Sequence, residues 1–380
     1  MRSIRYIILS SLLMLAGSCV SKFIPEVNEA NELLVVEGLI TDQPGINSVR
    51  LSKSVPLAEM NTIKPLKNCV VTITDDAGNA YSLTEKTDGT YVTDSTEFQG
   101  VVGRKYQLRI KLNDQTFSTG TYESFPMEMK AVPPIDSVYY EKVTLKLRDD
   151  GIPMEEGCQI YLDTHDPQGK SKFYRWTFSE TWQINLPYPT EKNVCYTSEN
   201  STTIKIKTTA SVSVDRVSGY PLHYVSNNSD RLEVKYSILA RQFSLSEEEF
   251  DYWSRLKSVS EETGGLYDII PASVNGNLYN VYDPYEQVLG FFSVSAVSAK
   301  RLFIEEPFAG QPNLYTKCVT DTSFVMNEDS IPGINQNIWL LLRYDYGMPP
   351  YLLLSRNRQC ADCTTRGTTV EPAFWRDDED

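Results

Sequence analysis

Alternating apolar and polar side chains dominate the chain from residue 33 onward. In GRKYQLRIKL, every second residue from Tyr106 to Leu112 is apolar and the residues between them are polar. This period of two predicts a half-buried β-strand. Similar short runs recur with turn signals such as Asp88-Gly89 between them, which is typical of β-sandwiches. We therefore expect an immunoglobulin-like β-sandwich over residues 33–125.

A second, larger region follows a proline-rich break that contains Pro126, Pro133 and Pro134. Proline removes a backbone donor from a ladder, so a linker is expected there. Most of residues 130–376 again read as strands. One segment has helical spacing: Ser246 and Glu249 form a capping-box pattern, and Gly264-Gly265 is a stop signal, which predicts an amphipathic helix at about 247–262. The fold prediction is mostly β, a β-sandwich followed by a β-rich domain with one inserted helix.

The N-terminus has the three-part layout of a secretory signal. Arg2 and Arg5 precede an apolar run of about ten residues, which is half of what a membrane-spanning helix needs. The small residues 16–18 stand directly before Cys19, as in the lipobox of bacterial lipoproteins. We expect residues 1–18 to be a signal peptide, Cys19 to carry the lipid, and residues 19–32 to be a lipidated linker. Residues 377–380 are an acidic tail.

Composition and charge narrow the classes of function. The 380 residues carry a formal net charge of -14, and removal of the signal peptide with Arg2 and Arg5 takes it to -16. A protein that follows nucleic-acid phosphates would need the opposite sign, so we expect no nucleic-acid partner. Only two histidines, His165 and His223, occur, which excludes multi-histidine metal sites. No cofactor and no metal site is expected.

The remaining cysteines are even in number, as expected for an exported protein with disulfides. Cys360 and Cys363 form a CxxC in a polar loop rather than at the start of a helix, so redox catalysis is not favoured, and a zinc site would need a second ligand pair. The pairing stays open. The expected disulfide or structural thiol residues are Cys69, Cys158, Cys195, Cys318, Cys360 and Cys363.

Catalytic chemistry has little support in the sequence. Asp163 and Asp166 flank His165, but this pattern is also typical of a solvated hairpin turn. No GxSxG nucleophile elbow accompanies either histidine. We therefore predict no catalytic residues and no enzyme activity. Hydrolysis of an envelope polymer by this trio remains the least favoured alternative.

Tyrosines in two loop-like segments suggest a binding surface. One group lies in NGNLYNVYDPYEQ and the other in RYDYGMPPYLLL. Exposed tyrosine suits protein interfaces, although aromatic residues also complete the cores and edges of sheets. The candidate interface residues are Tyr279, Tyr282, Tyr285, Tyr344 and Tyr346.

The second half of the chain resembles a known family. YSILARQFSLSEEEFDYWSRLKSVSEETGGLYD, LGFFSVSAVSAKRLFI and CADCTTRGTTVEPAFW resemble a family of Bacteroidota lipoproteins called domain of unknown function four-two-four-nine. In that family an arginine often follows the second cysteine, whereas Thr364 stands here. The resemblance implies an outer-membrane lipoprotein, a TonB-dependent receptor as partner, and no assigned activity.

These observations together predict a lipid-anchored protein of the outer membrane, on either its exterior or its periplasmic face. We expect a non-catalytic binding or accessory subunit that works with a TonB-dependent receptor in ligand uptake. The alternative is a surface structural or adhesive lipoprotein without a transporter partner. A receptor encoded by a neighbouring gene and an aromatic or acidic docking surface would favour the accessory-subunit hypothesis.

Overall fold

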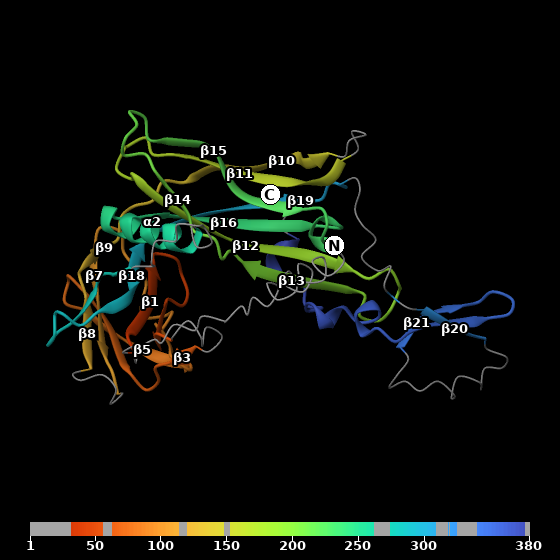
Figure 1. Cartoon of the computed structure of the whole chain (residues 1–380), viewed down its shortest axis with the longest axis horizontal. Coiled ribbons are helices and arrows are strands. Elements are labelled where there is room, and N and C mark those ends of the chain that lie inside the picture. Colours follow the sequence, from red (N-terminus) through yellow and green to blue (C-terminus); the bar gives the residue numbers. More distant parts are fainter. Residues whose placement is uncertain are drawn as a thin grey trace, which may run out of the picture.

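The computed structural model shows a mostly β protein with one α-helix among its described residues (Figure 1). The described residues are 32–55, 63–113, 120–147, 153–261, 274–308, 318, 320–324 and 340–376. The predicted signal peptide, Cys19, the linker up to residue 31 and the acidic tail lie outside them. Over the described part of the chain, no helix has the length and apolar character needed to cross a bilayer.

A large mixed sheet that nearly closes on itself surrounds the first core. Its strands follow the order β17-β8-β7-β4-β5-β6-β2-β1-β18, with β3 beside β2 and β9 beside β7. Only the β1–β18 pair is parallel. The strands from the N-terminal part are β1 (Leu34–Thr41), β2 (Ser48–Lys53), β3 (Lys64–Pro65), β4 (Val70–Asp75), β5 (Ala80–Thr87), β6 (Thr90–Val92), β7 (Lys105–Lys111), β8 (Thr121–Ser124) and β9 (Met127–Glu128).

The expected immunoglobulin-like sandwich over residues 33–125 is not confirmed. Instead of two separate sheets, the chain forms one sheet that needs two strands from much later in the sequence, β17 (Leu278–Asn280) and β18 (Val288–Ser295). They pair with the free edges of β8 and β1. Alternation along a strand shows which side chains are buried, but it does not show which distant strand pairs with an edge.

Two glycines allow the ends of the large sheet to meet. Asn275 and Leu289 form a bridge that joins the β17 end to β18. At Gly290, where φ is +90°, an added Cβ would lie 1.9 Å from the Val36 carbonyl oxygen. At Gly276 an added Cβ would lie 1.5 Å from the Gly290 carbonyl oxygen. The backbones therefore approach more closely here than any side chain would permit.

The second core lies between two antiparallel sheets. A three-stranded sheet, β10-β11-β15, lies over a sheet ordered β13-β12-β16-β19, in which β14 also pairs with β12 (Figure 1). Trp176, Tyr174 and Tyr236 fill the space between them and are fully buried. The strands are β10 (Ile135–Leu147), β11 (Pro153–His165), β12 (Phe173–Asn185), β13 (Val194–Asn200), β14 (Lys205–Thr208), β15 (Arg216–Ser226), β16 (Tyr236–Ser244) and β19 (Val297–Ile304).

Helix α2 (Glu247–Glu261) packs where the two cores meet. β18 belongs to the first core and passes through Ala296 directly into β19 of the second core. The helix starts at the predicted cap, because the Ser246 Oγ accepts a hydrogen bond from the Glu249 backbone N–H at 3.1 Å. It is one residue shorter in the described chain than the predicted 247–262. Its aromatic face packs on both cores.

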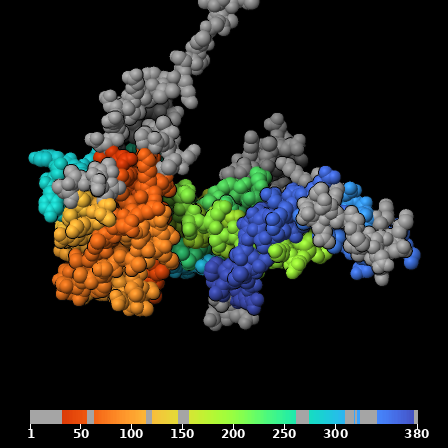
Figure 2. All heavy atoms as spheres, turned by 90° about the horizontal axis from the view of Figure 1, so that it is seen from below, coloured from red at the N-terminus to blue at the C-terminus, as the bar shows by residue number. Residues whose placement is uncertain are grey.

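The C-terminal part adds a small sheet and short 3₁₀ turns. β20 (Thr320–Phe324) and β21 (Leu340–Asp345) both pair with β22 (Tyr351–Ser355). This hairpin region projects from the end of the molecule opposite the large sheet (Figures 1 and 2). The 3₁₀ turns of the described chain are η2 (Asp230–Leu232), η4 (Arg358–Cys360), η5 (Cys363–Thr365) and η6 (Ala373–Trp375).

Candidate functional site

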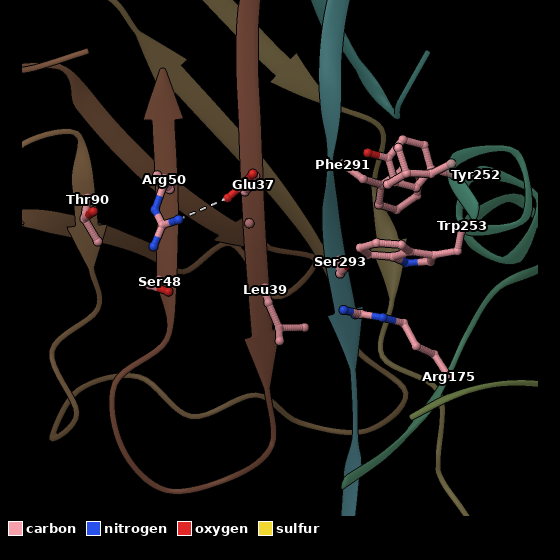
Figure 3. A pocket seen from close by; sticks show the side chains of 12 residues that line it. Glu37, Leu39, Ser48, Arg50, Thr90, Arg175, Tyr252, Trp253, Phe291 and Ser293 are labelled. Atoms are coloured by element: carbon pink, nitrogen blue, oxygen red, sulfur yellow. Dashed lines mark hydrogen bonds and ion pairs between the residues drawn. The ribbon is translucent and has the colours of Figure 1, made fainter. Parts of the chain in front are cut away.

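A pocket of about 380 Å³ lies between helix α2 and the large sheet (Figure 3). Its volume is within the range of small-molecule sites. The walls come from both cores, so the pocket exists only because α2 bridges them. The lining residues are Glu37, Gly38 and Leu39 of β1, Ser48 and Arg50 of β2, Thr90 of β6, Arg175 of β12, Phe291 and Ser293 of β18, and Tyr252, Trp253 and Leu256 of α2.

Arg175 is the cation on the β12 side of the pocket. Its guanidinium lies 3.9 Å from the ring centroid of Trp253 and 5.5 Å from that of Phe243, which are cation–π contacts. Burial lowers the pKa of Arg175 below its ordinary value. No residue that the structure describes makes a hydrogen bond or a close ion pair with this guanidinium. The guanidinium N–H groups of Arg175 are therefore available to another group.

Glu249 is a buried carboxyl beside this cation. Its Oε1 accepts hydrogen bonds from Ser293 Oγ at 2.6 Å and from Trp253 Nε1 at 3.2 Å. Its Oε2 is buried without a hydrogen-bond partner among the described residues. Burial raises the pKa of Glu249, and the attraction of Arg175 opposes that rise only in part. The side chain of Glu249 thus fixes the indole of Trp253 and does not close a full capping box.

Tyr252 and the Arg50–Glu37 pair complete the charged and polar lining. Burial raises the pKa of Tyr252 to about 12, and its ring packs against Phe291 with the centroids 4.9 Å apart. Arg50 Nη1 lies 3.5 Å from Glu37 Oε2, and both side chains are more than half exposed. Such an exposed pair contributes little to stability. In Figure 3, α2 presents Tyr252 and Trp253 from one side while Arg50 and Thr90 stand on the opposite side.

The lining combines polar donors with apolar surface. It offers guanidinium and hydroxyl donors together with aromatic and aliphatic surface, and it contains neither histidine nor cysteine. None of these residues was predicted from the sequence to belong to a site, and Trp253 lies within the predicted helix at about 247–262. An arginine within the apolar run FYRWTF of β12 was the available signal, but alternation alone places it on an exposed face.

The residues once considered for hydrolysis have separate local partners. His165 Nδ1 lies 2.7 Å from Asp136 Oδ2, and Asp163 accepts hydrogen bonds from Ser137 Oγ and from the Gly219 backbone. Asp166 accepts backbone N–H groups of its own turn. Burial would raise the pKa of Asp166, but these hydrogen bonds outweigh it and lower the pKa. Each carboxylate therefore stabilises its turn or hairpin.

The structure separates the six cysteines into two disulfides and two buried thiols. Cys195 pairs with Cys363 and Cys318 pairs with Cys360, so the CxxC residues bond to different partners. Burial raises the pKa of the Cys158 thiol to about 12, and Cys69 is also buried. In the part of the chain that the structure describes, no group of three or more His, Cys, Asp or Glu side chains is placed to hold a metal ion.

The two tyrosine groups lie at opposite ends of the molecule (Figure 1). Tyr282 and Tyr285 follow β17 at the end of the large sheet and are 67% and 97% exposed. Tyr279 is held by Glu123 through a hydrogen bond of 3.2 Å. Tyr344 and Tyr346 follow one another at the end of β21, with ring centroids 4.5 Å apart. The structure therefore does not bring the five residues into one surface.

Comparison with known proteins gives one family. A family model described as "Domain of unknown function (DUF4249)" matches residues 20–301, which is more than half of the chain. The CADC segment and Phe374-Trp375, which the sequence resemblance included, lie beyond the matched residues. No curated protein matches the chain.

Proposed function

Since the chain belongs to the DUF4249 family, which is described only as a domain of unknown function, we propose that it is an outer-membrane lipoprotein of Bacteroidota type that acts as a non-catalytic binding subunit. Cys19 carries the lipid in this proposal. The partner is a TonB-dependent receptor, and the joint task is ligand uptake. Support comes from the lipobox-like N-terminus, the sequence resemblance and an exposed aromatic surface.

That surface carries the proposal, and we call it the tyrosine edge: Phe125, Val281, Tyr282 and Tyr285. Phe125 is 57% exposed where its backbone N–H donates to the Asn277 carbonyl before β17, and Tyr282 and Tyr285 are 67% and 97% exposed on the loop after β17. The loop is built to hold them there, because Asn280 Oδ1 accepts the Tyr282 backbone N–H and Asp283 Oδ1 accepts that of Tyr285. Aromatic side chains that protrude from a fixed loop are the residues that dominate protein interfaces.

The position of the tyrosine edge also fits a docking role. Its loop, residues 281–285, belongs to the cyan segment at the outer end of the large sheet, beside strands drawn in orange (Figure 2). No side chain of the pocket lining belongs to the tyrosine edge. One protein could therefore dock a partner at the tyrosine edge and hold a ligand in the pocket at the same time.

Affinity purification of the tagged lipoprotein from detergent-solubilised outer membranes tests the proposal. We expect a TonB-dependent receptor in stoichiometric amount, and its loss when Tyr282 and Tyr285 are both changed to Ser. Tyr346→Ser is the matched control, because Tyr346 is equally exposed, at 87%, but lies at the opposite end. A chain that elutes alone at low salt in mild detergent would refute the receptor partnership and favour the adhesive alternative.

A further inference from the structure

We propose that the pocket beneath α2 binds a small organic monoanion, with its carboxylate on Arg175 and its apolar body against the aromatic residues of α2 and β18. Nothing about the family assigns a ligand or a site here. The inference deepens the proposed binding role and rests on it, because it names the chemical class of the ligand that a binding subunit would hold.

The surroundings of Arg175 favour an anionic ligand. Other half-buried guanidinium groups of the described chain have side-chain hydrogen-bond partners, as Arg366 has in Asp230 and Arg241 has in Ser179. Among the described residues, Arg175 has the π faces of Trp253 and Phe243 and the charge of the Glu249 carboxyl near it, but no hydrogen-bond partner. Stacking orders the guanidinium plane while its N–H groups stay unused. Arginine in this state is prepared for bidentate binding of a carboxylate.

The side chains around this cation are held in place before any ligand binds. Ser293 Oγ and Trp253 Nε1 both donate to Glu249, so the indole cannot turn away from Arg175. Besides burial, the charges of Glu37 and, with the opposite and smaller effect, of Arg175 both act on the pKa of Tyr252. Its hydroxyl makes no hydrogen bond with a described residue, so it remains a second donor in the same pocket. Preorganised donors reduce the entropy lost when a ligand binds.

The charge balance favours one negative charge on the ligand. Arg50, the other cation of the lining, already pairs with Glu37. Glu37 would repel a second negative charge on the ligand. The buried carboxyl of Glu249 lies near the place of the ligand's first charge, at Arg175. A phosphate monoester carries close to two charges at neutral pH and would lack a second cation. A carboxylate matches the site better.

The remaining surface selects an apolar body. Tyr252 and Phe291 pack together in the pocket wall, and Leu39 and Leu256 also line it. A volume of about 380 Å³ accepts a group of the size of a phenyl ring or a short alkyl chain with its carboxylate. Burial of such a group releases water from apolar surface and adds affinity that acetate would lack.

Titration of the full-length Cys19→Ala chain with phenylacetate, hexanoate and their uncharged amides tests the inference by calorimetry and Trp fluorescence. We expect both acids to bind and both amides to bind about tenfold more weakly or worse, because a hydrogen-bonded charge is lost. Inorganic phosphate should not compete. Equal binding of acids and amides, no binding of either acid, or competition by phosphate would overturn the inference.

Three variants locate the binding. Arg175→Gln should abolish the preference for acids, and Tyr252→Phe, which removes only a hydroxyl, should weaken acid binding about threefold to tenfold. Arg241→Gln is the control, since Arg241 is a half-buried cation on the same sheet but outside the pocket, where it donates to Ser179. If Arg175→Gln misfolds, Tyr252→Phe still tests the proposed pocket. Unchanged acid binding in Tyr252→Phe would count against that pocket as the binding site.

This test is independent of the receptor. Acid binding by the purified chain without capture of a receptor would refute the proposed partnership but leave the pocket assignment intact. Receptor capture that survives in Tyr252→Phe and Arg175→Gln, without acid binding in the wild type, would refute the pocket assignment alone. The two proposals can therefore fail separately.

Discussion

Cys363 forms a disulfide with Cys195, 168 residues earlier in the chain, whereas its near neighbour Cys360 bonds to Cys318. The first bond fixes η5 against β13 of the second core. The second bond connects the same short segment to residues just before β20. The CxxC motif is thus a junction that holds the small C-terminal sheet to the body.

Replacing Cys195 and Cys363 together by Ser should lower the free energy of unfolding by roughly 2–5 kcal/mol, because the unfolded chain regains the entropy that the cross-link removes. Denaturant titration under oxidising conditions measures this. Limited proteolysis should at the same time cleave the segment around η5 sooner than in the wild type.

The Cys318→Ser, Cys360→Ser double variant is the matched control for this prediction. It removes a bond with a sequence separation of 42 and should cost less than the 168-residue link. A reductant breaks both bonds, so the reduced wild type should be less stable than either oxidised variant. Identical stability of all forms would show that neither bond constrains the folded chain.

The surroundings of Glu180 predict that the folded protein loses stability in acid. Glu180 lies between the two sheets of the second core, 3.3 Å from His223 Nε2, and accepts a hydrogen bond from Tyr236 at 2.9 Å. Burial would raise its pKa, but these bonds and the charge of Arg231 outweigh burial and lower the pKa. The stabilisation is therefore complete above the ordinary value of 4.5 and is lost as pH falls through the lower folded-state pKa.

Glu180→Gln should reduce stability at pH 7 by roughly 1–3 kcal/mol, since the hydrogen bonds lose their charge. It should also flatten the decline of stability below pH about 4.5. Thermal unfolding as a function of pH measures both effects. Glu199→Gln is the control, because Glu199 also pairs with Arg231 but is 55% exposed, and exposed pairs contribute about 0–1 kcal/mol. A wild-type-like decline in Glu180→Gln would contradict the assignment.

Glu249 predicts the opposite sign of pH dependence. Burial raises its pKa above the ordinary 4.5, so the folded protein holds a proton that the unfolded chain releases. The contribution is present below pH about 4.5 and is lost as pH rises through the raised folded-state pKa, at up to about 1.4 kcal/mol per pH unit. In Glu249→Gln this slope should be absent. Glu248→Gln is the control, since hydrogen bonds at the helix start lower the pKa of Glu248; a slope that persists in Glu249→Gln would place the proton elsewhere.

Local sequence patterns were sufficient to predict individual strands and the helix, but not to predict which strands pair. Alternation correctly identified β7, where Tyr106, Leu108 and Ile110 are buried, and the cap at Ser246 correctly placed the start of α2. Both signals act within a few residues. The parallel pairing of β1 with β18 joins residues about 250 positions apart, and no period along the chain contains that information.

The pocket escaped prediction for the same reason. Arg175, Trp253 and Glu37 lie on three different elements and meet only after α2 has packed across both cores. In the sequence each one reads as an exposed strand residue or a helix-face residue. The tyrosine edge was partly predictable, because Tyr282 and Tyr285 stand in a loop with turn residues, whereas Phe125 reaches the same edge of the sheet only because the end of β8 bonds to Asn277.

Gly290 provides a test of the closed sheet that separates steric clash from backbone strain. Gly290→Ala places a Cβ 1.9 Å from the Val36 carbonyl oxygen at a φ of +90°, so β1 and β18 must move apart and lose ladder hydrogen bonds. Gly78→Ala is the matched control, because Gly78 has a φ of +87° and nothing lies within 4 Å of an added Cβ. Strain alone should cost Gly78→Ala roughly 1–3 kcal/mol. Gly290→Ala should cost at least about 2 kcal/mol more and, in amide hydrogen exchange, should expose β18 selectively; equal losses in the two variants would mean that β1 and β18 do not approach closely at this position.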